Sequence, residues 1–375
     1  KRVGWGASGR NGGFCCFGGT KLSEGDLIKR YGLAEARKFV LYQIEAMEKV
    51  AKRLDAWKLD VDRHSKGEMM LAHRPSELQV FEEEAAFLKK YFGYQPKLYS
   101  RAELAERGIA GPEFHGGLHV PFGFALNPMK YVQGLAAKVR EKGGRIFSRS
   151  PVEAIERDAN RWFLALPDGS VIARKVILAG NGYAREDVPN WLFGRTLPAM
   201  SSVVVTRPLT EDELGAQGWT SDLMAADTRT LLHYFRLLPD RRFLFGTRGG
   251  IFETEQALNA TQRRGRADFD RMFPEWRHVE TEYSWYGHVC LTRNLTPYVG
   301  PVPDMEGVFA AMAWHGSGIA MASLSGEKIA DLALGKIKQA DLPAAVSQPF
   351  DRFPFPALRQ AYLQGAYLWY GFRDR

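Results

Sequence analysis

Residues 4–13 bring together residue types that could hold an anion or an extended cofactor. Five glycines occur there, together with Ser8, Arg10 and Asn11. Glycine permits positive φ angles and close backbone approach, so successive N–H groups can line a concave anion site. Arg10 would add a fixed positive charge. Chain ends are also often rich in glycine, so these residues alone leave both interpretations open.

Two later turns that contain glycine follow apolar segments. Residues 176–179 (Val-Ile-Leu-Ala) lead into Gly180, and residues 308–313 lead into Trp314 and His315. An apolar run is typical of a strand buried on both faces, and ligands bind outside the carboxyl ends of such strands. A helix expected over residues 319–334 would begin after the second turn. Its free N–H groups would favour a negatively charged group.

The elements that must position these turns follow from periodicity and from end signals. Ser100 with Glu103 forms a capping-box pattern, and Asn127 precedes Pro128 as an N-cap. Apolar residues at helical spacing, together with these signals, predict helices over residues 33–57, 76–91, 100–108, 128–142, 255–272 and 319–334. Short apolar or alternating runs predict strands over residues 145–147, 152–155, 162–166, 176–179, 202–206, 231–236, 243–246 and 308–313. This order is typical of an α/β protein with mixed sheets.

The segment GWGASGRNGG resembles a flavin-contacting loop of the D-amino acid oxidase-like superfamily of FAD-dependent amine oxidoreductases. Within that superfamily the chain is most similar to the γ-glutamylputrescine oxidoreductase group. The similarity continues through Trp285-x-Gly287, Thr292 to Pro297 and Gly300, the Gly316-Ser317-Gly318 turn, and the tail around residues 353–356. It covers nearly the whole chain. It departs from the family at Ser317, where histidine is common, and at Asn294, where many members have aspartate.

The resemblance implies a set of residues that contact FAD through the backbone or through small side chains. Val152 would bond adenine through its backbone, and the turn before the last long helix would meet the flavin. The implied contacts are Gly6, Ala7, Ser8, Gly9, Arg10, Asn11, Gly12, Gly13, Val152, Ala179, Gly180, Asn181, Trp285, Gly287, Gly300, Gly316, Ser317, Gly318 and Ile319. Some sarcosine oxidases attach FAD through a cysteine, but the equivalent position here is Gly287. Non-covalent FAD is therefore expected.

The resemblance also implies two interleaved domains. An FAD-binding, Rossmann-like three-layer domain would comprise residues 1–40, 118–190 and 288–375. A substrate or cap domain built on a mixed sheet would comprise residues 41–117 and 191–287. No GxGxxG fingerprint precedes the glycine-rich loop, although such a unit takes about 30 residues. We therefore expect that this sequence lacks an N-terminal segment of the protein, which would carry the fingerprint.

The expected reaction is FAD-dependent oxidation of a C–N bond in an amine or amino-acid derivative, with a γ-glutamylated amine as the best specific guess. The flavin would accept hydride at N5, and water would hydrolyse the imine. No catalytic residue is assigned; the candidates are Arg236, Tyr234 and His315. Arg236 could hold a carboxylate or form an ordinary ion pair. The alternatives are a dehydrogenase of D-amino or N-methyl amino acids with an acceptor other than O2, and a flavin-free relative acting as a binding module.

The composition of the chain narrows the possible classes of protein and of partner further. The chain has 375 residues, of which 45% are hydrophobic and 25% charged, as in ordinary globular proteins. Its net charge of +8 arises from scattered lysines and arginines, so a nucleic-acid partner is not expected. No apolar run reaches the length of about 18 residues that a membrane span needs. The histidines lack metal-site spacing. Three cysteines suit a reducing compartment, so a cytoplasmic location is expected.

Overall fold

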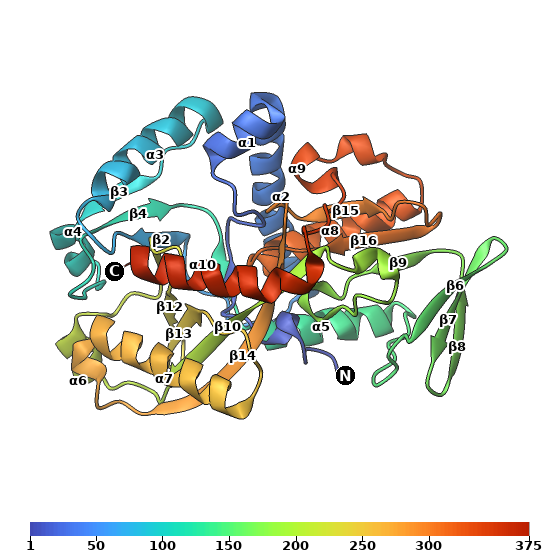
Figure 1. The fold of residues 1–375 in the computed structure, drawn as a ribbon. Coiled ribbons are helices and arrows are strands. Elements are labelled where there is room, and N and C mark those ends of the chain that lie inside the picture. Colours follow the sequence, from blue (N-terminus) through green and yellow to red (C-terminus); the bar gives the residue numbers. More distant parts are fainter. Residues whose placement is uncertain (375) are drawn as a thin grey trace.

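The chain folds around one large mixed sheet and a smaller sheet beside it. The computed structural model describes residues 1–374 (Figure 1). The large sheet has eight strands, of which only β11 and β2 run parallel to each other. In spatial order its strands are β14 (Thr281–Thr292), β10 (Thr196–Thr206), β13 (Phe243–Arg248), β12 (Tyr234–Leu237), β11 (Met224–Asp227), β2 (Glu68–Leu71), β4 (Gly116–Val120) and β3 (Lys97–Ser100). The prediction of a mixed α/β fold is confirmed.

The smaller sheet carries the two turns that contain glycine. Its strands are, in order, β15 (Tyr298–Pro301), β16 (Val308–Met312) and β9 (Val176–Leu178). Strands β16 and β9 are parallel, so the turns that follow them lie at the same edge of the sheet. Among residues 1–374, strand β9 pairs with β16 alone, and Ile177 is 42% exposed. The expectation that this strand is buried on both faces is therefore wrong.

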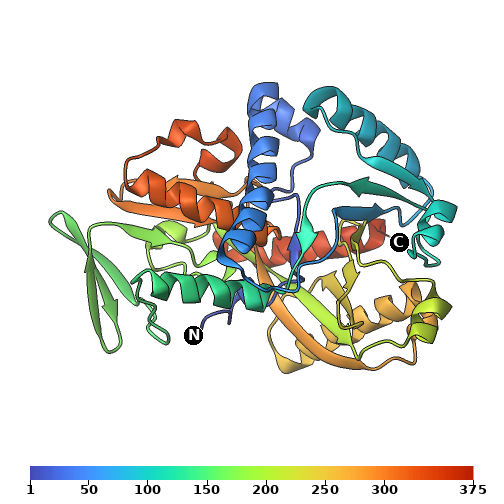
Figure 2. The ribbon, with the colours of Figure 1, turned by 180° about the vertical axis from the view of Figure 1, so that it is seen from behind.

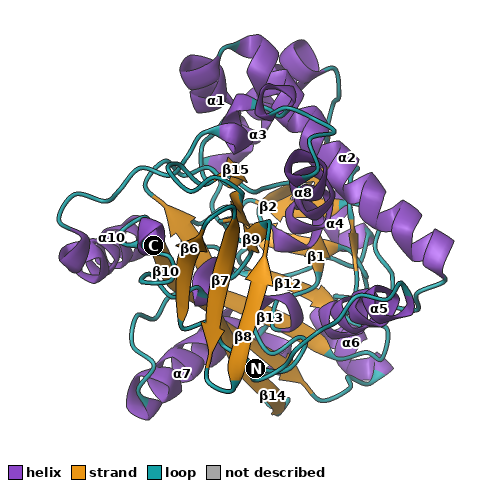
Figure 3. Cartoon of the chain, turned by 90° about the vertical axis from the view of Figure 1, so that its right-hand side faces the viewer, coloured by secondary structure: helices purple, strands orange, loops and turns teal. Residues whose placement is uncertain are grey.

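Two further sheets are small. β6 (Ala154–Asp158), β7 (Arg161–Leu166) and β8 (Gly169–Ala173) form an antiparallel sheet at one end of the molecule (Figure 1), the end that faces the viewer in Figure 3. β1 (Phe14–Cys15) pairs with β5 (Phe124–Ala125) behind the N-terminal loop. The strand predicted at residues 145–147 is absent, because this exposed segment pairs with no strand in the described chain.

The helices begin at the capping signals that the sequence shows. Ser100 and Glu103 form the capping box of α4, and the Asn127 side chain accepts hydrogen bonds at the start of α5. The helices are α1 (Glu24–Tyr31), α2 (Leu33–Trp57), α3 (Glu77–Phe92), α4 (Arg101–Glu106), α5 (Pro128–Glu141), α6 (Glu211–Gln217), α7 (Glu255–Met272), α8 (Gly318–Ala333), α9 (Ala344–Ser347) and α10 (Arg359–Arg373). The helices predicted at residues 33–57 and 255–272 are confirmed at both ends.

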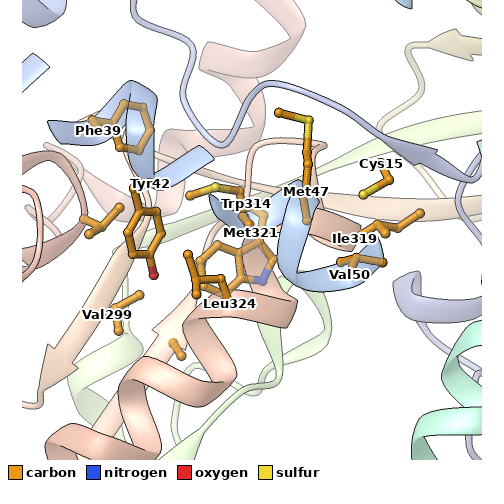
Figure 4. Packing of buried hydrophobic residues seen from close by; sticks show 14 of the residues in the cluster. Cys15, Phe39, Tyr42, Met47, Val50, Val299, Trp314, Ile319, Met321 and Leu324 are labelled. Atoms are coloured by element: carbon orange, nitrogen blue, oxygen red, sulfur yellow. The ribbon is translucent and has the colours of Figure 1, made fainter. Parts of the chain in front are cut away.

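Helix α2 packs against α8 in the core beside the smaller sheet. From behind, α2 runs down the centre of the molecule, with α8 on one side of it (Figure 2). Met47, Val50 and Trp314 lie in this core, which Figure 4 shows from close by. The Tyr42 hydroxyl lies 2.9 Å from the Ser325 hydroxyl and fixes the helix pair. Residues 41–57 of α2, which were expected in the cap domain, thus share a core with α8, and their domain assignment stays a prediction. The small side chains of α8 allow this close approach.

A second core lies against the large sheet and is rich in aromatic rings. Trp219, Phe235 and Phe243 are fully buried there, and α7 supplies Phe269 to the same cluster. Burying one such side chain contributes about 1.5–3 kcal/mol. The division into two interleaved domains stays a prediction. Three of its proposed limits, at residues 40, 117 and 287, fall inside α2, β4 and β14.

Candidate active site

A cavity of about 1390 Å³ lies between the smaller sheet and the large sheet. Its wall includes the N-terminal loop, the turn after β9, the start of α8, and residues of β12, β13 and α3. A pocket for one small ligand usually measures about 300–1,000 Å³. This cavity therefore has room for an extended cofactor and a substrate side by side.

The N-terminal loop is held in shape by its own asparagine. The Asn11 side-chain amide donates to the carbonyl of Ala7 at 2.9 Å, and its oxygen accepts from the N–H of Gly13 at 2.8 Å. The Trp285 indole N–H donates to the carbonyl of Arg10 at 2.9 Å. Asn11 therefore shapes the loop and leaves the backbone of residues 6–8 on the cavity wall.

The turn after β9 is tied to the end of β16. Asn181 adopts a positive φ of 50°, and its side-chain oxygen accepts from the N–H of Ala313 at 2.8 Å. Tyr183 follows, and its hydroxyl accepts from the N–H of His288 at 3.1 Å. Gly180 and Asn181 line the cavity together with Gly6 and Gly316. The structure thus brings together the three segments that the sequence singled out.

The first turn of α8 faces the cavity without a side-chain cap. Ser317 occupies the N-cap position, but its hydroxyl donates to the carbonyl of Phe17 at 3.1 Å instead of accepting from the helix. Gly318 and Ile319 line the wall, and neither carries a polar side chain. The free N–H groups of this 16-residue helix therefore point to a site for an electron-rich group.

His315 is a buried residue that holds two segments in place. Its Nε2 accepts from the N–H of Thr292 at 3.3 Å, and its Nδ1 donates to the carbonyl of Gly19 at 3.2 Å. Burial, with the positive charge of Lys21 nearby, lowers the pKa of His315 to about 3. Because both nitrogens are engaged and a pKa of about 3 makes the ring a very weak base near neutral pH, the structure does not support His315 as a general base.

Arg236 also serves the loop rather than the cavity. Its Nε donates to the carbonyl of Gly12 at 2.8 Å, its Nη2 to the carbonyl of Leu126 at 2.9 Å, and its Nη1 to His64 Nε2 at 2.7 Å. The side chain is 2% exposed and lies behind the cavity wall. The structure therefore does not support Arg236 as the ligand of a substrate carboxylate, because three of its five N–H donors bond protein groups and the side chain does not line the cavity.

Tyr234, the third catalytic candidate, does line the cavity. Its hydroxyl lies 3.0 Å from the Ser201 hydroxyl, and burial raises its pKa. The Arg248 guanidinium carbon lies 5.8 Å from the centre of the Tyr234 ring. Tyr234 also fills the space beside Gly12, where a Cβ would lie 2.6 Å from the ring. The ring thus separates the N-terminal loop from the substrate side of the cavity.

Several charged wall residues gave no signal in the sequence. Lys21 lies on the cavity wall, and reduced access to bulk water together with the nearby Arg248 lowers its pKa to about 8. Burial raises the pKa of Glu84 to about 7, and Glu24 beside it adds to the shift. Glu68 is a further carboxyl on this wall. Single charges without regular spacing cannot be distinguished from surface residues by sequence.

Most of the implied FAD contacts lie on the cavity wall, and the rest lie behind it. On the wall are Gly6, Ala7, Ser8, Arg10, Asn11, Gly12, Ala179, Gly180, Asn181, Gly287, Gly316, Ser317, Gly318 and Ile319. Behind it are Gly9, Gly13, Val152, Trp285 and Gly300. Gly300 packs against the side chain of Tyr298 instead, because a Cβ at this position would lie only 2.7 Å from the Tyr298 hydroxyl oxygen.

Together, the parallel β9–β16 pair, the uncapped helix start and the adjoining charged cavity define an oxidoreductase with a nucleotide cofactor. Comparison with known proteins identifies the family. The chain belongs to the DAO family of FAD dependent oxidoreductases, whose model matches residues 1–332. FAD is the cofactor of this family. The cavity fits it by volume, by the free N–H groups of α8, and by glycines where a side chain would intrude.

The relatives and the structural neighbours agree with this assignment. The chain is 29% identical to gamma-glutamylputrescine oxidoreductase of Escherichia coli K12, over 100% of this chain and 85% of the relative. It is 29% identical to the probable oxidoreductase OrdL of Haemophilus influenzae, over 89% of this chain and 76% of the relative. Glycine oxidase from Geobacillus kaustophilus has the same fold, with a TM-score of 0.73, 17% identity, and coverage of 92% of this chain and 87% of that chain. In the described residues, no helix is long and apolar enough to cross a membrane.

Proposed function

We propose that the protein oxidises the C–N bond of an amine or amino-acid derivative, and that a γ-glutamylated amine is its substrate. The observation that carries this proposal is the charge pattern on the substrate side of the cavity. Glu24, Glu68 and Glu84 suit a substrate ammonium group, and Lys21 and Arg248 suit a carboxylate. A γ-glutamylated amine carries both groups. The relative from Escherichia coli named for such a substrate supports the same choice.

The bound FAD would supply the acceptor for the hydride, and this chain would supply its binding site. The backbone of residues 6–8 and of residues 179–181 would hold the cofactor on one side. The uncapped start of α8 would stabilise negative charge on the other side. On the wall opposite, Tyr234 and the charged groups would orient the substrate.

We propose that FAD is held without a covalent bond. Cys290 lies on the cavity wall, but burial, with Glu186 nearby, raises the pKa of its thiol to about 12. A protonated thiol is a weak nucleophile. Acid precipitation should therefore release all of the flavin into the supernatant. The three buried free cysteines also support the proposal of a reducing, cytoplasmic location.

The decisive experiment is anaerobic mixing of the purified flavoprotein with a panel of amines. The panel contains γ-glutamylputrescine, putrescine, glycine, sarcosine and D-alanine. Bleaching of the flavin band at about 450 nm reports oxidation of the substrate. The proposal expects the fastest bleaching with γ-glutamylputrescine, and faster bleaching with glycine or sarcosine would contradict it. Reoxidation by O2, compared with a quinone dye, then separates an oxidase from a dehydrogenase.

The role of the α8 start is tested by Gly318→Val. A Cβ at residue 318 would already lie 3.4 Å from Trp314, so the larger valine must extend into the cavity. We expect FAD content to fall at least about tenfold, because the side chain would take the cofactor's place. Gly215→Val on α6 is the control, since nothing lies within 4 Å of that position. Normal FAD content in Gly318→Val would show that this turn does not contact the cofactor.

A further inference from the structure

The carboxyl group of Glu68 is a recessed charge in the cavity wall without a cationic partner. Glu68 is the first residue of β2, which lies between β11 and β4 and is the third strand from one edge of the large sheet. Its side chain lines the cavity, and in the described chain no lysine, arginine or histidine acts on it. The side chain is half-buried, and a carboxylate with reduced access to water and no cation beside it is costly, so a ligand cation is the natural partner.

The groups around Glu68 leave one side of the carboxyl open. The Cys16 thiol, on the segment after β1, interacts with the carboxyl and works against the rise of its pKa. Lys21, further along that segment, acts on Cys16 rather than on Glu68. On β4, His119 bonds the carbonyl of Lys66, two residues before Glu68. Helix α3 contributes Glu77 and Glu84 to other parts of the wall.

The reaction proposed above needs a group of this kind. A primary alkylamine resembles a lysine side chain, whose pKa is about 10.4, so the substrate arrives as an ammonium ion. The nitrogen lone pair must be free before the C–N bond can become C=N. A carboxylate in contact with the ammonium can take up the proton. Such a base works best when its pKa lies near the working pH, and burial raises the pKa of Glu68 to about 7.

We propose that Glu68 binds the substrate ammonium group and accepts its proton before the C–H bond is oxidised. This inference rests on the proposed function. In the step, an N–H bond of the substrate breaks and an O–H bond forms on Glu68. The electron pair of the N–H bond stays on nitrogen, so the step itself is not a redox reaction. The free amine then remains beside Cys16 and Tyr234 on the cavity wall.

The test is the pH dependence of anaerobic flavin reduction in Glu68→Gln, Glu68→Asp and the wild-type holoenzyme. The wild-type rate constant should rise through about pH 7 and then level off. In Glu68→Gln we expect a loss of about 100-fold at pH 8. Its remaining rate should have no inflection near neutrality and should rise toward about pH 10, where free amine becomes abundant. Glu68→Asp should retain an inflection.

Glu84→Gln is the matched control, because Glu84 lines the same cavity and its pKa is also raised to about 7. The neutral inflection should persist in this variant, whatever its effect on KM. An inflection unchanged in Glu68→Gln, or abolished only in Glu84→Gln, would overturn the proposal.

A second measurement does not depend on turnover. tert-Butylamine has no α C–H bond, so its binding to the holoenzyme can be followed by the shift of the flavin spectrum. Wild-type affinity should fall at least about tenfold as the pH drops below 7, because protonated Glu68 no longer attracts the ammonium. Glu68→Gln should bind weakly at every pH. If the amine panel fails to reduce the wild type, the proposed function fails, and this titration still decides the role of Glu68. A pH-independent wild-type affinity would overturn that role.

Discussion

Replacing Arg236 by lysine separates the role seen in the structure from the role first expected of this residue. Arginine makes three hydrogen bonds here, to the carbonyls of Gly12 and Leu126 and to His64. A lysine ammonium can reach only one of the two carbonyls. The other carbonyl and the His64 nitrogen then lose their donor.

The expected magnitude follows from those two lost partners. An unsatisfied buried polar group costs about 1–3 kcal/mol, so Arg236→Lys should lower the free energy of unfolding by about 2–6 kcal/mol. Gly12 belongs to the N-terminal loop on the cavity wall. If about 1.4 kcal/mol of that cost destabilises the loop conformation that binds FAD, the Kd of FAD rises about tenfold.

The assay measures urea unfolding of the apoprotein, the Kd of FAD on reconstitution, and the substrate KM at saturating FAD. We expect the first two to change and the KM to stay within about threefold. Arg266→Lys is the control, because Arg266 bonds Asp270 and several carbonyls near α7. It should lose stability but keep its affinity for FAD. A large rise in KM with unchanged stability and FAD affinity would refute this reasoning and restore Arg236 as the ligand of a substrate carboxylate.

Two further predictions concern stability. Burial would lower the pKa of His233, but hydrogen bonds to Asp227 and Asp268 raise it to about 9. The charged ring therefore stabilises the fold fully below about pH 6.5, and about 3 kcal/mol of the free energy of unfolding is lost as the pH rises through 9. In urea unfolding, His233→Gln should flatten this dependence of the free energy of unfolding on pH. An unchanged pH dependence would contradict the prediction. In Gly18→Ala, a Cβ would lie 1.8 Å from the Ser317 hydroxyl, at a φ of 141°. Gly18→Ala should therefore lower the melting temperature. Adding Ser317→Gly should restore it in part, since backbone strain of about 1–3 kcal/mol remains. A double variant no more stable than Gly18→Ala would argue against the clash.

Local sequence signals were enough to predict much of the secondary structure and the loop that is expected to bind the cofactor. Helix α7 begins at Glu255, directly after its N-cap Thr254, and ends before Phe273, as the sequence predicted. The glycines of the N-terminal loop and of the α8 turn were recognisable because tight turns beside a ligand require them. The segment at residues 145–147 shows the limit of such signals, because a strand forms only where a partner strand is present.

Only the tertiary structure decided which charged groups belong to the cavity. Arg236 and Arg248 both lie on strands of the large sheet, yet Arg236 is used by backbone carbonyls while Arg248 faces the cavity. Glu68 and Lys21 come from different segments and meet at one wall through Cys16. A sequence shows the types of side chains and their spacing along one element. The direction in which a side chain points, and what surrounds it, depend on how distant elements pack together, and those contacts determine burial, pKa and chemical role.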